Sequence, residues 1–355
     1  MIQTLRNILV VRTDRLGDVI LTLPVCETIR NAAPSAHVTM LARTYVRPLL
    51  AGNALVDDVL WDDDEQGKPK PFLALRNELR AKRFDAAIIV RPTLRNALLA
   101  ATARIPVRVG SGYRWYSGLM TDKVYEHRKT AEHHELEYNL RLLAPLGMPV
   151  DPPETPHYGI RVPEDARREI RAVLESLGVE AGRKVVVLHP ASGGSAREWP
   201  AERFREVGAR LLSRGDVSVV VTGMPSEERT LRQVVTPGGP AFISLVGRLR
   251  LVSLAALLER ATLFISNSTG PLHLATALGT SVIGLYPPVL PMSAMRWGPY
   301  SRNSAVFSGS GPGSCNRCSR KAPCICMLSI PVDQVAAAAN NALDRPVSRK
   351  GANEA

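Results

Sequence analysis

Ile8-Leu-Val-Val-Arg-Thr-Asp-Arg-Leu-Gly-Asp18 combines a short apolar run with a polar loop and the start of an amphipathic stretch. A second segment of the same kind begins with Lys184-Val-Val-Val-Leu-His189, which a Gly/Ser-rich loop follows. A strand that ends in a small polar loop before a helix is the repeating unit of a parallel, doubly wound sheet. The two segments therefore predict two Rossmann-like α/β domains in one chain.

The rest of the chain continues both series by alternating β-branched runs with amphipathic stretches. In the first half we expect strands over 8–12, 37–42, 58–61, 85–90 and 107–110, and helices over 19–31, 72–81, 95–103 and 133–146. In the second half we expect strands over 184–189, 217–222, 241–245, 263–266 and 281–285, with helices over 164–177, 201–213, 227–235, 251–261, 270–278 and 332–344.

Domain boundaries follow from composition. Residues 151–163 are rich in proline and lack periodicity, so they predict a linker between a domain over 1–150 and a domain over 164–330. Residues 331–344 predict a C-terminal helix, and 345–355 a disordered tail. No apolar run approaches the roughly 18 to 20 residues of a membrane helix, and the charged start does not resemble a signal peptide, so we expect a cytoplasmic protein.

The formal charge of +12 is spread along the chain, since residues 1–150 carry 21 basic and 16 acidic side chains and the remainder carries 24 and 17. With aromatic residues at 5%, this spread argues against a nucleic-acid-binding module. The densest basic group is compatible with an anionic acceptor at a membrane surface, and equally with solvated surface arginines. Its members are Lys82, Arg83, Arg91, Arg95, Arg104, Arg108, Arg114, Lys123 and Arg128.

Four of the five cysteines crowd into Cys315, Cys318, Cys324 and Cys326. Without a secretory signal, a disulfide framework is not expected. A C-x2-C pair followed by C-x-C could ligate zinc or iron, although the second spacing is shorter than the usual spacers. We expect a site that needs no metal and leave a metal at this cluster open.

Asp18 is the candidate catalytic residue of the first half. We expect it at the carboxyl edge of the first strand, where open α/β sheets bind their ligands, and at the start of the following helix. A carboxylate there could accept a proton from an attacking hydroxyl group. On the local pattern alone, Asp18 could also be a plain helix N-cap.

Two loops of the second half have the composition of a phosphate site, and a third, acidic loop lies between them in the sequence. The segment His189-Pro-Ala-Ser-Gly-Gly-Ser-Ala-Arg-Glu-Trp-Pro200 follows a strand, and its small residues would let backbone N–H groups approach a phosphate. Phe264-Ile-Ser-Asn-Ser-Thr-Gly270 leads into a helix whose first turn holds His273, which could equally be structural. Thr222-Gly-Met-Pro-Ser-Glu-Glu228 follows the strand between them, and its acids could simply favour a helix start.

Taken in order, these motifs resemble the heptosyltransferases of glycosyltransferase family 9, over residues 8 to about 335. The string Arg12-Thr-Asp-Arg-Leu-Gly-Asp18, with Thr22 and Pro24, resembles the amino-terminal motif of that family, whose Asp is the catalytic base. Arg197 falls where a lysine is more usual, and Ser268 falls where an Asp often precedes Thr-Gly. The cysteine segment before the last helix also resembles that of many members.

The resemblance implies a GT-B fold with two Rossmann-like domains facing a cleft, an acceptor-binding domain over 1–150 and a nucleotide-sugar-binding domain over 164–330. It implies an inverting transfer from ADP-heptose to a lipopolysaccharide inner-core acceptor of the lipid A-Kdo type, by a monomer at the inner membrane surface. Asp18 and Arg197 would be catalytic, with Arg15 and Arg91 binding the acceptor. The donor would contact Ser192, Gly193, Arg197, Glu227 (or Glu228 in the other register), Ser268, Thr269, Gly270 and His273.

Rival functions make different predictions from the sequence. A dinucleotide-dependent oxidoreductase predicts G-x-G-x-x-G after a first strand, and neither half contains it. A family member with another nucleotide sugar, or with a protein or capsule glycan as acceptor, would keep every motif named above. A non-catalytic nucleotide-binding protein would keep the three loops of the second half and would have no use for a base at Asp18.

Overall fold

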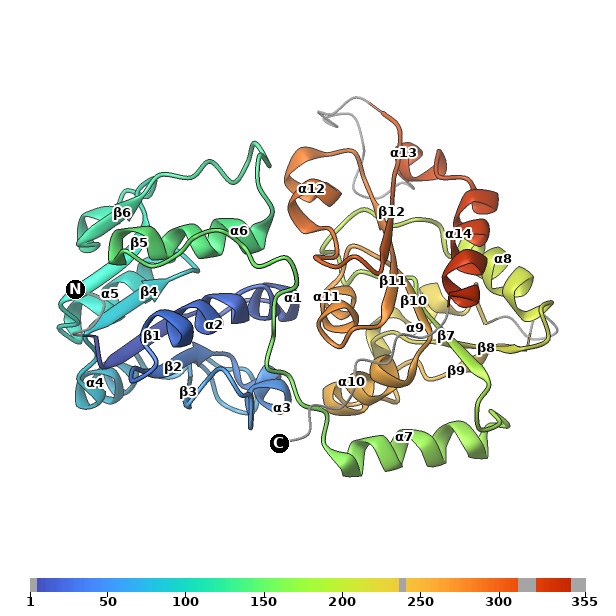
Figure 1. The fold of residues 1–355 in the computed structure, drawn as a ribbon, viewed down its shortest axis with the longest axis horizontal. Coiled ribbons are helices and arrows are strands. Elements are labelled where there is room, and N and C mark those ends of the chain that lie inside the picture. The colour runs from blue at the N-terminus through green and yellow to red at the C-terminus, as the bar shows by residue number, and fades with distance from the viewer. Residues whose placement is uncertain (1–4, 236–240, 312–323, 346–355) are drawn as a thin grey trace. The chain divides into compact units, whose positions relative to one another are not determined.

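The computed structural model describes residues 5–235, 241–311 and 324–345, and the chain divides into two compact units (Figure 1). The first unit comprises Met1–Val162 and Met295–Tyr300, and the second comprises Pro163–Ala294 and Ser301–Ala355. Each unit is built on a six-stranded sheet whose strands are all parallel. The predicted α/β class with two doubly wound sheets is confirmed.

The first sheet has the order β3-β2-β1-β4-β5-β6. Its strands are β1 (Asn7–Val11), β2 (His37–Ala42), β3 (Asp58–Trp61), β4 (Ala86–Ile89), β5 (Val107–Ser111) and β6 (Asp122–Val124). In β1, Val11 pairs with Leu41 on one side and with Ile89 on the other. The strand order reverses between β1 and β4, so the loops that follow these two strands flank the point where doubly wound sheets bind ligands.

The helices of the first unit cover both faces of this sheet (Figure 1). They are α1 (Leu16–Ile20), α2 (Leu23–Ala32), α3 (Arg47–Leu50), α4 (Phe72–Lys82), α5 (Leu94–Thr102) and α6 (Glu135–Leu140), with 3-10 turns η2 (Thr44–Val46), η3 (Ser117–Leu119) and η4 (Arg141–Leu146). The apolar sides of α4 and α5 pack together on one face, and α2 packs against α6.

Two helices expected as continuous are each interrupted. The helix expected over 19–31 is α1 followed by α2, because Pro24 in the first turn of α2 has no N–H and its ring would clash with a continuing helix. The helix expected over 133–146 begins at Glu135 and becomes the 3-10 segment η4, which contains Pro145. Both corrections have the same cause, a proline inside an otherwise periodic stretch.

The second sheet has the order β12-β11-β10-β7-β8-β9, which reverses between β10 and β7. Its strands are β7 (Lys184–His189), β8 (Val217–Val221), β9 (Ile243–Ser244), β10 (Leu263–Asn267), β11 (Ser281–Tyr286) and β12 (Ser304–Ser308). The central strands β7, β8 and β10 are buried along almost their whole length. Their carboxyl ends lie at one edge of the sheet, because neighbouring strands are parallel.

In Figure 1, α8 (Ala201–Leu212) and α14 (Val332–Asp344) lie on one side of the second sheet, and α10 (Leu251–Arg260) and α11 (Gly270–Ala277) on the other. Helix α7 (Glu164–Ser176) packs against α10. The shorter segments are η5 (Pro225–Glu227), α9 (Glu228–Leu231), η6 (Leu290–Met292), α12 (Ala294–Trp297) and α13 (Ile325–Leu328). Among the residues with described structure, no helix is both long and apolar enough to cross a membrane.

The last strand of each sheet is absent from the expected elements. β6 has three residues and half-exposed ends, so its sequence carries no apolar alternation long enough to indicate a strand. β12 lies within residues 286–329, whose Pro, Gly and Ser content is typical of a loop. Both strands lie at sheet edges, where short and polar strands are usual. The expected disordered tail lies, apart from Arg345, outside the described residues.

Trp199 anchors the core between the second sheet and its covering helices. It is 1% exposed, its ring meets Phe204 edge to face, and its indole N–H donates to the Ile330 carbonyl oxygen at 3.2 Å. We expect Trp199→Ala to lower the free energy of unfolding by about 3–5 kcal/mol, as truncation of a buried aromatic side chain usually does. Urea unfolding measures this loss. The control is Trp115→Ala, because Trp115 is 83% exposed and its truncation should leave the unfolding midpoint in place. Equal midpoints for the two variants would contradict the assignment.

Candidate active site

Asp18 lies just beyond the carboxyl end of β1, beside the reversal point of the first sheet. Helix α1 begins at Leu16 and its N-cap is Arg15, so Asp18 belongs to the first turn of the helix. The expectation that the helix starts at Asp18 is therefore wrong, and so is the plain N-cap interpretation. The side chain of Asp18 is 16% exposed, which leaves the carboxylate within reach of a ligand.

Arg12, the residue after β1, holds this carboxylate. Its Nη2 donates to Asp18 Oδ1, and its Nε donates to Asp14 Oδ1 at 2.7 Å. Burial raises the pKa of the Asp18 carboxyl group, and the positive charge of Arg12 lowers it in part. The negative charges of Asp14 and Glu135 raise this pKa further. A carboxylate with a raised pKa is a better proton acceptor than an ordinary surface aspartate. The sequence motifs assigned no role to Arg12. A charged residue at the end of an apolar strand is unusual, and this signal could have indicated Arg12 as a site residue.

The two predicted acceptor-binding arginines, Arg15 and Arg91, lie near this loop and differ in their contacts. Arg91, which follows β4, donates from Nη1 to the Thr13 carbonyl oxygen at 2.8 Å and lies 3.8 Å from Asp14. Arg15 is exposed at the start of α1. The structure thus brings Arg91 and Asp18 to the same edge of the sheet from the two strands that flank the reversal.

Several members of the densest basic group are engaged locally rather than available to an acceptor. Lys82 pairs with Asp58, Arg95 with Asp62, and Arg128 with Glu135. Arg108 donates to backbone carbonyl groups of its own neighbourhood. Only part of this positive charge therefore remains to attract an anion.

In the second unit, the loop after β7 is tied to the loop after β8 through Glu227. Glu227 Oε1 accepts from the backbone N–H of Gly193 at 2.8 Å, and Oε2 accepts from that of Met224 at 2.8 Å. Gly193 has φ +57°, a left-handed conformation that favours glycine. Glu228, the alternative register, is exposed and pairs with Arg232. Of the two acids, Glu227 is the one beside the Gly/Ser loop.

The loop after β7 is also tied to the end of β10. Asn267 Oδ1 accepts from the backbone N–H of Trp199 at 2.8 Å, and its Nδ2 donates to the Pro190 carbonyl oxygen. Ser195 Oγ donates to the Ser268 carbonyl oxygen at 3.0 Å. The loops that follow β7, β8 and β10, which hold the predicted donor-binding residues, are thus joined at one edge of the second sheet.

Helix α11 begins at this edge with the expected small polar residues. Its N-cap Thr269 makes no side-chain cap hydrogen bond, and the buried Thr269 hydroxyl has no hydrogen-bond partner within the described part of the chain. Gly270 opens the helix and His273 is 4% exposed in its first turn. Ser192 and Ser268 are almost buried beside the joined loops, and Arg197 is half-buried in the first of them. A helix N-terminus with an unsatisfied hydroxyl is suited to a phosphate.

Asn267 offers a test of how these loops are held. If the joined loops bind ADP, as the resemblance implies, Asn267→Ala should weaken that binding about tenfold, because two buried backbone groups would lose their partners and the loop after β7 would loosen. Calorimetric titration with ADP measures the affinity. Asn303→Ala, at the opposite edge of the same sheet, is the control and should bind ADP as the unmodified protein does. Unchanged affinity in Asn267→Ala would show that the loop needs no such anchor.

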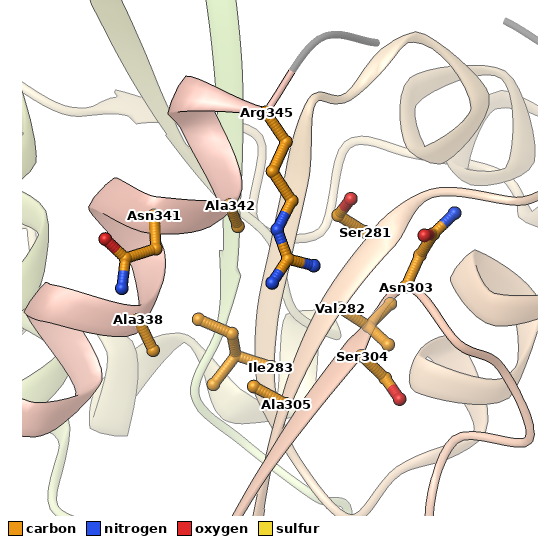
Figure 2. A pocket seen from close by; sticks show the side chains of 10 residues that line it. All are labelled: Ser281, Val282, Ile283, Asn303, Ser304, Ala305, Ala338, Asn341, Ala342 and Arg345. Carbon is orange, nitrogen blue, oxygen red and sulfur yellow. The ribbon is translucent and has the colours of Figure 1, made fainter. Parts of the chain in front are cut away.

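A cavity of about 120 Å³ lies elsewhere in the second unit (Figure 2). It is lined by the first residues of β11 and β12 and by the last turns of α14, with Ser281, Ser304 and Arg345 among its polar groups. These are amino ends of strands, so the cavity lies at the edge opposite the joined loops. It is separate from the candidate donor site.

The candidate metal cluster is only partly described. Cys315 and Cys318 lie outside the described residues, and Cys324 and Cys326 are buried near the start of α13. Within the described ranges, no three His, Cys, Asp or Glu side chains gather as metal ligands would.

Comparison with known proteins identifies the family. The model of the glycosyltransferase family 9 (heptosyltransferase) matches residues 72–325. A putative glycosyltransferase of Haemophilus influenzae is 30% identical over 301 residues, which cover 83% of this chain and 86% of that protein. The chain belongs to glycosyltransferase family 9.

Two heptosyltransferases of Escherichia coli are also similar to this chain. The lipopolysaccharide heptosyltransferase 3 of Escherichia coli is 27% identical and covers 82% of this chain and 84% of its own length. The structure of the E. coli ADP-heptose lipopolysaccharide heptosyltransferase II superposes with a TM-score of 0.76 at 22% identity, covering 95% of this chain and 98% of that one. The protein is a family 9 glycosyltransferase with the GT-B class of fold, as its sequence motifs predicted.

Proposed function

We propose that this family 9 glycosyltransferase transfers a heptose from ADP-heptose to an inner-core acceptor of lipopolysaccharide, with inversion at the anomeric carbon. The family itself and the names of the E. coli relatives, which include lipopolysaccharide, heptosyltransferase and ADP-heptose, support the substrate class. The observation that carries the reaction type is the half-buried Asp18 carboxylate beyond the end of β1, which Arg12 holds, while Arg91 contacts the same loop at Thr13 and Asp14.

In the proposed reaction, an acceptor hydroxyl oxygen attacks the anomeric carbon of the donor. The bond from that carbon to the diphosphate oxygen breaks, and ADP leaves with the bonding electron pair. Asp18 takes the proton of the attacking hydroxyl, and Arg12 holds the carboxylate in position for it. A single displacement of this kind inverts the configuration, and it requires no metal or other cofactor.

The second unit would bind the donor. The Thr269 hydroxyl and the amino end of α11 would receive the diphosphate, and Arg197 would oppose the negative charge that grows on it as the bond breaks. Ser192, Gly193, Ser268, Gly270 and His273 would complete the contacts. Both oxygens of Glu227 already accept backbone hydrogen bonds, so its contact with the nucleoside would use the remaining lone pairs.

The first unit would bind the acceptor. Arg15 and Arg91 would contact its anionic groups beside Asp18. We propose that the protein works as a monomer in the cytoplasm, at the surface of the inner membrane, where such an acceptor is presented.

A second candidate keeps the reaction and changes the substrate. Ser268 stands where many family members have an acid, and Arg197 stands where lysine is more usual. Arg and Lys differ in reach and in hydrogen-bond geometry, so the donor loop of this chain would contact its ligand differently from a loop with lysine. These two departures favour a different nucleotide sugar, or an acceptor outside lipopolysaccharide, as the alternative.

The test is a transfer assay on the full chain. Purified protein is incubated with ADP-heptose and Kdo-lipid A, and the glycolipid is analysed by mass spectrometry and by NMR of the new glycosidic bond. We expect one added heptosyl residue with inverted anomeric configuration. Retained configuration would contradict the single displacement, and transfer only from another nucleotide sugar, or only to another acceptor, would select the second candidate.

A further inference from the structure

A buried carboxylate outside the motifs named above lies at the centre of the first unit's charged network. Glu135, the first residue of α6, has a side chain that is 1% exposed. It accepts hydrogen bonds from Arg128 Nη1 and, on its other oxygen, from Arg296 Nε at 3.1 Å and Nη2 at 2.9 Å. Arg12 Nη1 lies 3.5 Å from Glu135 Oε1. Three arginines therefore converge on one anion.

These arginines come from distant parts of the sequence. Arg12 follows β1, Arg128 precedes α6, and Arg296 belongs to Met295–Tyr300, a segment that returns to the first unit after β11. Asn139, one turn further along α6, accepts from Arg12 and Arg128 and donates to the Leu21 carbonyl oxygen at 3.0 Å. The network thus links α6 to Asp18 in α1 through Arg12, and to Leu21, the C-cap of α1, through Asn139.

We propose that Glu135 is a positioning residue for Asp18. It balances the positive charge of the arginines around Arg12, so that Arg12 holds the Asp18 carboxylate without making it a weaker base. This rests on the proposed role of Asp18 as the base. Buried charges are tolerated when they are paired. A buried arginine that loses one anionic partner therefore interacts more strongly with the anions that remain. For Arg12, the remaining anions are Asp14 and Asp18.

The sign of the effect follows from the charges that face each carboxylate. Asp18 faces Arg12, Asp14, Glu135 and the Tyr45 phenol; Glu135 faces Arg12, Arg128, Arg296 and its neighbour His134. Neutralising Glu135 removes a negative charge near Asp18 and leaves the positive ones. The ionised form of Asp18 is then favoured, so its pKa falls and it becomes a weaker base.

The test is the pH dependence of kcat/KM in the transfer assay, whose acid limb reports the base of the free enzyme. We expect Glu135→Gln to move the acid limb down by about one pH unit and to lower kcat about tenfold. Glu135→Asp keeps the charge and should restore most of the limb's position. Glu137→Gln is the matched control, because Glu137 lies on the same helix but contacts His133, His134 and Tyr300 instead of the arginines.

Arg296→Met provides a second route if Glu135→Gln does not fold. It removes a positive charge that pairs with Glu135, so the pKa of Asp18 should rise and the acid limb should move to higher pH. An acid limb that stays in place in every variant of Glu135 and Arg296 that folds would overturn the positioning role. Asp18→Asn separates the two proposals: if it retains turnover, the proposed base is wrong, whereas loss of turnover with an unmoved limb in Glu135→Gln refutes only this inference.

Discussion

Asp18→Asn is expected to lower kcat about a thousandfold while the affinity for ADP stays unchanged. The amide has nearly the same shape but cannot take the proton of the attacking hydroxyl, and a well-placed base contributes about 10²–10⁴ in rate. Arg12 would still be paired with Asp14 and Glu135, so the change leaves the buried guanidinium compensated. Single-turnover kinetics with ADP-heptose and Kdo-lipid A measure the loss, and calorimetry measures ADP binding.

Asp58→Asn is the control for this substitution. Asp58 is the first residue of β3, so it lies at the amino edge of the same sheet, where it pairs with Lys82. This variant should turn over at the rate of the unmodified protein. If Asp18→Asn also keeps its full rate, Asp18 is not the base.

Arg197→Ala is expected to lower kcat about a hundredfold and to weaken ADP binding about tenfold. A cation beside the leaving diphosphate gains importance as negative charge develops, so the rate should suffer more than the ground-state affinity. Steady-state kinetics together with ADP titration separate the two effects.

Arg197→Lys tests the same position with the charge retained. Lysine is the more usual residue of the family at this point, so this variant should recover most of the rate and affinity. A similar loss in both variants would indicate that hydrogen-bond geometry matters more than charge. Unchanged kinetics in Arg197→Ala would remove the residue from the donor site.

Most of the fold could be predicted from the sequence because central parallel strands are buried on both faces and read as continuous apolar runs, as in Lys184–His189. The prediction fails where this signal weakens. β6 and β12 are short edge strands that need only one apolar side, and the breaks near Leu21 and after Leu140 depend on single prolines. At these prolines the surrounding sequence keeps a helical periodicity, so it predicts continuous helices where the structure has breaks.

The candidate site was predictable to a similar extent. Loops that follow parallel strands must meet at one sheet edge, so the strand pattern alone groups Glu227, Ser268 and Thr269 with the Gly/Ser loop. The network around Glu135 could not be predicted in this way, because it joins residues more than 100 positions apart through side chains alone. No periodicity or motif carries that information.

The central claim, that the second unit is an ADP-heptose site, is tested most directly by calorimetric titration of the full chain with ADP, ADP-heptose, UDP-sugars and NAD. We predict saturable binding of ADP and ADP-heptose, with UDP-sugars and NAD binding at least about tenfold more weakly. Preference for a UDP-sugar, or no nucleotide binding by the folded protein, would contradict the claim.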